Sequence, residues 1–172
     1  ADLERNSILF EGEFAMQSSQ HIKANLLSLN LGYKTDQFDW IKSLTAGLDI
    51  VSGDDSKTDE LEGFSKYFGA RHKHHGYYDY GSHKKYFGHA HEGLQELNLK
   101  GKFNFLASSN LLVAMHSFSS HDGITKYGNE LDLIIKRKVS DELSSEFGLV
   151  FYNPEVGDDL LTFMYVMFTA NL

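Results

Sequence analysis

The stretch "TFMYVMFTANL", residues 162–172, changes character at every second position. One set of alternate positions holds Met164, Val166, Phe168, Ala170 and Leu172. The other set holds Phe163, Tyr165, Met167, Thr169 and Asn171. A period of two predicts a β-strand, because successive side chains of a strand point to opposite faces of the sheet. After Thr162 the first set has no polar residue, so the strand is expected to carry one wholly apolar face.

The same alternation recurs along the chain and predicts eight strands, at residues 6–17, 21–34, 37–51, 94–106, 109–119, 127–139, 142–152 and 160–172. These segments are longer than the roughly 5–6 residues of an average strand, and they match the roughly 9–11 residues that cross a bilayer at a tilt. The sequence therefore predicts an all-β fold, an antiparallel up-and-down transmembrane β-barrel. Residues 1–172 would form one barrel domain, either complete or as the C-terminal part of a larger barrel.

The connections between these segments predict how the barrel is oriented. Tight links are expected at 35–36, 107–108 and 140–141, and longer ones near 18–20, 52–93, 120–126 and 153–159. Outer-membrane barrels alternate in this way, with tight turns on the periplasmic side and longer loops outside. Residues 52–93 would then form one long external loop, and the predicted location is the outer membrane of a Gram-negative bacterial cell.

Composition excludes several other classes of protein. The chain of 172 residues has a formal net charge of −8 and no cysteine. The acidic balance argues against a nucleic-acid partner, and the missing cysteines exclude disulfides and thiolate metal sites. No apolar run approaches the ~18 residues of a membrane helix. The expected partners are outer-membrane lipid, lipopolysaccharide and, during insertion, the barrel-assembly machinery, whereas the oligomeric state is left open.

Alternation alone does not decide which face points inward, so two other interpretations stay open. A soluble β-barrel would turn the Phe10, Phe14, Leu99 and Phe103 face inward and bind an apolar ligand there. A structural outer-membrane barrel would have no pore. The charges expected on the apolar faces are Lys42 and Arg137, both near tight links. At that depth a long side chain reaches the lipid headgroups, which favours a membrane barrel.

Two motifs lie within residues 44–80, "LTAGLDIVSGDDSKTDELEGFSKYFGARHKHHGYYDY". Gly47, Asp49, Ser52, Gly53 and Asp54 form the first motif, and His72, Gly76, Tyr77 and Asp79 form the second. They resemble the alginate-export family of outer-membrane porins, in which "aGxDxxSGD" leads into a loop ending in "HxxxGYxD". The segments "LQELNLKGKFNF" and "YGNELDLIIKRKVSDELSSEFGLVFYNP" are similar to the last strands of that family. The resemblance implies a larger porin barrel, of which this chain is the C-terminal part.

The polar set of alternate positions supplies the candidate lumen residues. In a wide barrel these side chains line water and set selectivity, and lysines favour an anionic solute such as an acidic polysaccharide. In a narrow barrel the same charges would have to pair with one another. The candidate residues for contact with a solute are Lys100, Lys102, Lys136, Lys138, His116, Glu130, Asp132 and Asp49.

Histidines are concentrated in the predicted external loop. His72, His74, His89 and His91 could bind zinc or copper if the loop folds back on itself. We expect instead an aromatic, histidine-rich loop that packs over the pore mouth, and we predict no metal site and no cofactor. His116, Ser117 and Asp122 are close in sequence, but nothing in their spacing places them as a catalytic triad. The sequence therefore predicts no enzyme.

Overall fold

The protein is described by a computed structural model, which covers residues 6–65, 75–78, 92–155 and 159–171. Its eight strands are β1 (Asn6–Ser18), β2 (Lys23–Thr35), β3 (Ile41–Val51), β4 (Leu94–Asn104), β5 (Ser109–Ser119), β6 (Lys126–Lys138), β7 (Leu143–Pro154) and β8 (Leu161–Ala170). Each overlaps one predicted segment, so the all-β prediction is confirmed. None of the described residues forms a helix with the length and apolar character that crossing a membrane would require.

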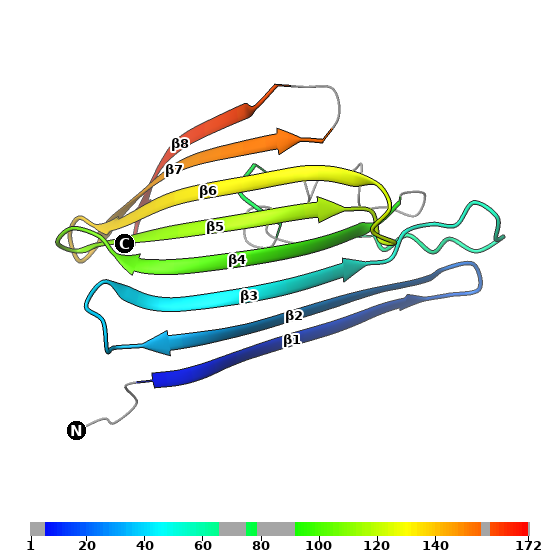
Figure 1. Ribbon diagram of the computed structural model, residues 1–172, viewed down its shortest axis with the longest axis horizontal. Helices are drawn as coiled ribbons and strands as arrows, with labels where there is room; N and C mark the ends of the chain where they lie inside the picture. Colours follow the sequence, from blue (N-terminus) through cyan, green and yellow to red (C-terminus); the bar gives the residue numbers. More distant parts are fainter. Residues whose placement is uncertain (1–5, 66–74, 79–91, 156–158, 172) are drawn as a thin grey trace.

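All eight strands belong to one sheet in sequence order, and each is antiparallel to the next. Figure 1 shows this up-and-down arrangement, with β1 in blue at one edge and β8 in red at the other. Among the described residues no pairing joins β8 to β1. The predicted antiparallel meander is confirmed, whereas the sheet itself is open.

The register places alternate side chains from neighbouring strands on the same face. Asp49 on β3 is opposite Glu96 on β4, and Glu96 is opposite Phe118 on β5. Two residues before Phe118, and on the same face, His116 on β5 is opposite Glu130 on β6. We call the face that carries these residues the polar face. The opposite side, which carries Leu97, Leu99, Met115, Met164, Val166 and Phe168, is the apolar face.

The links on one side of the sheet are residues 36–40, 105–108 and 139–142, and this side is the tight-turn end. Residues 19–22 and 120–125 lie at the other side, the long-loop end, where β3 and β7 also end. The prediction that short and long links strictly alternate is wrong at the first pair, because 19–22 is shorter than 36–40. Trp40 is the last residue of the 36–40 link, and its ring stacks on Phe103 with centroids 6.0 Å apart.

A β-bulge places Lys42 on a different face from the one predicted. The register of β3 against β4 shifts between Ile41 and Ser43, at the position of Lys42. The Lys42 ammonium donates a hydrogen bond to Oδ1 of Asn110, which is opposite Lys136 on the polar side of the sheet. The prediction that Lys42 lies on the apolar face is therefore wrong, since a bulge reverses the side to which the following residue points.

The apolar core lies on the polar face, close to the long-loop end. It consists of strand-end side chains from β3 to β7 together with residues that pack on them from the loops. Its buried members are Val51, Leu94, Phe118, Tyr127 and Tyr152. This cluster lies at the long-loop end, and charged residues occupy the middle of the polar face.

Candidate functional site

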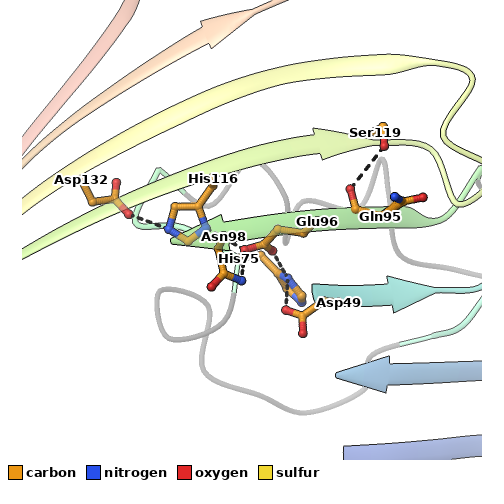
Figure 2. Close-up of polar contacts among 8 residues, drawn as sticks. All are labelled: Asp49, His75, Gln95, Glu96, Asn98, His116, Ser119 and Asp132. Atoms are coloured by element: carbon orange, nitrogen blue, oxygen red, sulfur yellow. Dashed lines mark hydrogen bonds and ion pairs between the residues drawn. The ribbon is translucent and has the colours of Figure 1, made fainter. Parts of the chain in front are cut away.

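Glu96 on β4 is at the centre of a buried charged network (Figure 2). Its side chain is 0% exposed. Nδ1 of His116 lies 2.6 Å from one carboxylate oxygen, and Nδ1 of His75 lies 2.7 Å from the other. The Asn98 amide donates to the first oxygen over 3.2 Å. Three polar side chains thus replace the water that this buried carboxylate has lost, as a buried ion requires.

His116 links two carboxylates from different strands. While its Nδ1 faces Glu96, its Nε2 lies 3.3 Å from Oδ2 of Asp132 on β6. A neutral imidazole has only one N–H donor, whereas both nitrogens here face carboxylate oxygens. The geometry therefore suits the imidazolium cation, which donates to both sides and offsets one of the two buried negative charges.

Apart from Asp132 Oδ2, which faces His116, three carboxylate oxygens in this region lack a hydrogen-bond partner among the described residues. They belong to Asp49, Glu130 and Asp132, and each of these side chains is buried. Asp49 Oδ2 lies 3.6 Å from Nδ1 of His75, and its Oδ1 has no partner. In this region carboxyl groups therefore outnumber the basic side chains that contact them.

Residues His75–Tyr78 cross the polar face, and we call them the covering segment. His75 contacts Glu96 on β4, as described above. The Tyr78 backbone N–H donates to Oε1 of Glu130 on β6 over 2.8 Å, and the Tyr78 ring stacks on Tyr152 of β7 at 5.5 Å. These four consecutive residues thereby contact several strands and cover the buried network.

Glycine is required at the second position of the covering segment. Gly76 has a φ of +79°, and a Cβ there would lie 2.4 Å from Oε1 of Glu130. An L side chain would therefore meet both backbone strain and a direct clash with a buried carboxylate. Gly76 lets the backbone approach Glu130 closely enough for the Tyr78 N–H to donate to it.

Tyr77 points to the other side of the segment, towards β8. Its ring stacks on Tyr165 with centroids 6.2 Å apart. The Tyr165 hydroxyl donates to Glu146 over 2.5 Å. Burial raises the pKa of the Tyr77 phenol above its usual value. The phenol is therefore neutral, and Tyr77 brings an aromatic surface to the site rather than a charge.

The four predicted lysines lie on the polar face, nearer the tight-turn end than Glu96. Lys136 forms an ion pair with Glu146 at 2.7 Å, and Lys138 forms one with Asp141 at 2.5 Å. Glu130 and Asp132 lie beside His116 and the covering segment, and Asp132 is at the same level of the ladder as Lys100. The polar face is thus acidic in its middle and basic towards the tight-turn end.

The eight predicted site residues all lie on one face, but only part of them come together. His116, Glu130, Asp132 and Asp49 share the buried network, whereas Lys100, Lys102, Lys136 and Lys138 form the basic part. Sequence reasoning left Glu96, His75 and Glu146 out of the candidate set. Glu96 and Glu146 carried a signal, since both fall on the polar alternation. No pattern marked His75 among the many loop histidines.

Two other sequence candidates are not assembled into sites. His72, His74, His89 and His91 lie outside the described residues. Ser117 faces away from His116, since neighbours in a strand point to opposite sides. Asp122 accepts a hydrogen bond from the Ser120 hydroxyl at 2.6 Å. These residues therefore form no triad.

No family model, curated protein or solved structure matches this chain. The resemblance to the alginate-export porins stays a prediction. Chemically, the described residues offer a buried array of carboxylates and imidazoles, a glycine-dependent cover and an adjacent set of lysines.

Proposed function

We propose that this chain is the wall of a transmembrane β-barrel in a bacterial outer membrane and that the barrel passes an anionic solute. The observation that carries the proposal is the polarity of the two faces. Phe10 is 73% exposed and Leu99 60% exposed on the apolar face, while Glu96 and Asp132 are 0% exposed on the polar face. A water-soluble protein buries the opposite set.

The free-energy cost of this arrangement depends on the medium that contacts the apolar face. Burying one large apolar side chain is worth roughly 1.5–3 kcal/mol, and this face exposes such side chains on every strand except β6, where they are half-buried. A groove of about 660 Å³ runs along it, lined in part by Ile8, Leu31, Leu44 and Leu99. Its shape and lining suit a lipid acyl chain, which would remove these groups from water.

The soluble alternative needs the same face to be interior. It places Phe10, Phe14 and Leu99 around an apolar ligand, yet these three side chains are among the most exposed of the described residues. We therefore favour lipid as the medium that contacts this face. The expected assembly partners remain outer-membrane lipid, lipopolysaccharide and the barrel-assembly machinery.

The anion preference of the proposal rests on the basic part of the polar face. A cavity of about 360 Å³ lies there, and its lining includes Lys136, Lys138, Ser144 and Thr169. Arg137 and Glu146 also line this cavity, so its basic groups exceed its acidic ones, which suits the carboxylates and hydroxyls of an acidic sugar. On this basis we assign the chain to transport rather than to catalysis.

A non-conducting structural barrel is the second candidate, and the covering segment favours it. Residues 75–78 lie across the polar face and contact strands β4, β6, β7 and β8. If they stay there, they narrow any lumen that the sheet would enclose. A conductance measurement therefore separates the two candidates.

The membrane part of the proposal is tested by placing a charge on each face. Leu99→Arg should lower the free energy of unfolding from lipid vesicles by about 2–4 kcal/mol, the cost of arginine near the bilayer midplane. The matched control is Lys100→Arg, the next residue, which points to the polar face. The unboiled wild-type protein should also migrate differently from the boiled one in a detergent gel. Equal stability of both variants, together with solubility without detergent, contradicts a membrane wall.

The transport part is tested by reversal potentials across a planar bilayer under a salt gradient. Changing Lys100, Lys102, Lys136 and Lys138 together to glutamate should shift selectivity from anions to cations, because these charges lie on the polar face, which would line the lumen. Lys57→Glu, in the external loop, is the control and should leave selectivity unchanged. Conductance with unaltered selectivity would contradict a role for these lysines. Absence of conductance in a protein that is folded and inserted would favour the structural barrel.

A further inference from the structure

Three buried side chains on the polar face bring metal-binding atoms together. One ligand atom from each of Asp49, His75 and Glu96 lies within 4.8 Å of the other two. Nδ1 of His75 is 2.7 Å from Oε2 of Glu96 and 3.6 Å from Oδ2 of Asp49. Ligands around a tetrahedral ion at ~2.1 Å lie roughly 3.4 Å apart. Changes of at most about 1.4 Å in these separations would bring the atoms to that spacing.

An independent observation points to a missing ligand at the same place. Asp49 is 6% exposed, and its Oδ1 has no hydrogen-bond partner among the described residues. Oδ1 of the neighbouring buried Asn98 is in the same condition. A buried oxygen without a partner costs free energy, and a native protein normally satisfies it with a side chain, a water molecule or an ion.

The backbone beside Asp49 leaves room for further oxygen donors. A Cβ added to Gly47 would lie 2.4 Å from Oδ1 of Asn30 and 2.6 Å from Oδ1 of Asn98. The two amide oxygens therefore converge from β2 and β4 over the one position of β3 that has no side chain. Asp49 follows two residues later on the same face, and Asn98 also donates to Glu96 Oε1 over 3.2 Å.

We propose that Asp49, His75 and Glu96 bind a divalent transition-metal ion of the zinc or manganese class, with Asn98 as a neighbouring oxygen donor. One imidazole and two carboxylates suit these ions, whereas calcium and magnesium prefer oxygen ligands alone. The ion would offset the negative charge of the Asp49 and Glu96 carboxylates. Because His75 belongs to the covering segment, the ion also fastens that segment to β3 and β4.

This site differs from the one that the loop sequence suggested. The loop candidates were His72, His74, His89 and His91, whereas the proposed ligands come from β3, β4 and the start of the covering segment. The proposal does not rest on transport, since a pore-free barrel could hold the same ion. Its test therefore uses metal binding rather than conductance.

The experiment uses the whole chain, folded in detergent and treated with EDTA. Calorimetric titration with Zn²⁺ should give one bound ion per chain at this site, and Co²⁺ should give the visible absorption of a bound ion. His75→Ala and Asp49→Asn should each weaken Zn²⁺ binding by at least about tenfold, the range seen when a metal site loses a supporting group. His121→Ala, an exposed loop histidine, should bind as the wild type does.

Two measurements keep the outcome decisive. Circular dichroism and the heat-dependent gel shift establish that each variant is folded, and Asp49→Asn keeps the size of the side chain if His75→Ala does not fold. Wild-type protein that binds neither Zn²⁺ nor Co²⁺ would overturn the proposal. So would wild-type affinity in both folded variants, because the ion would then be held by other histidines of the chain.

Discussion

Glu13 on β1 and Glu96 on β4 occupy the same level of the sheet and the same face. The register connects them through Ser28 and Asp49, each opposite the next. Glu13 is nevertheless exposed, whereas Glu96 is fully buried and contacts two histidines. Two carboxylates with the same place in the strand pattern thus have opposite environments.

The difference lies in what covers the two regions. The covering segment and the core around Phe118 and Tyr152 lie over the polar face from β3 to β7. Among the described residues, β1 is paired along one edge only, with β2. Alternation therefore assigns a side chain to a face, whereas residues from a distant part of the chain decide whether its charge is buried.

The largest effect is expected from removing the cation of the covered region. His116→Ala would leave Glu96 and Asp132 buried with one fewer partner each, and breaking a buried ion pair typically costs about 3–5 kcal/mol. Denaturant unfolding from detergent micelles measures the change. His121→Ala, an exposed histidine in the 120–125 loop, should stay within about 0.5 kcal/mol of wild type. Similar values for the two variants would mean that the network is open to water.

A smaller effect is expected from disturbing the cover itself. Gly76→Ala should destabilise the protein by about 1–3 kcal/mol, since strained backbone and the clash with Glu130 act together. Gly123→Ala is the matched control, because Gly123 has a φ of +74° but a Cβ there would meet only Gln95 Oε1, at 3.5 Å. The same unfolding measurement should give the larger loss for Gly76. An equal loss would show that residues 75–78 do not press on the polar face.

The smallest effect is expected at the uncovered edge. Glu13→Gln should change the free energy of unfolding by less than about 0.5 kcal/mol, as exposed substitutions usually do. Glu96→Gln, at the same level of the sheet, should cost more because it removes a charge that two histidines contact. A large loss of unfolding free energy in Glu13→Gln would contradict the difference between the covered and uncovered regions. It would indicate that β1 is covered in the assembled protein, as closure of the sheet would require.

The strands and the composition of their faces could be predicted from local sequence alone. Period two is a property of consecutive residues, so Asp49, His116, Glu130 and Asp132 were assigned to one face without any knowledge of the fold. The same reasoning failed at Lys42, where a bulge shifts the register. A bulge depends on how two strands pair, which a single strand's pattern does not contain.

The network depends on contacts between distant parts of the chain. His75 meets Glu96 across 21 positions, and Tyr78 meets Glu130 across 52. Alternation could place Glu96 on the polar face but not mark it as the residue between two histidines. It could not distinguish His75 from the other histidines of its loop. The sequence by itself determined which residues share a face, because side-chain direction follows from strand geometry. Tertiary structure alone decided which of those residues are buried together, because that depends on where a long connection crosses the sheet.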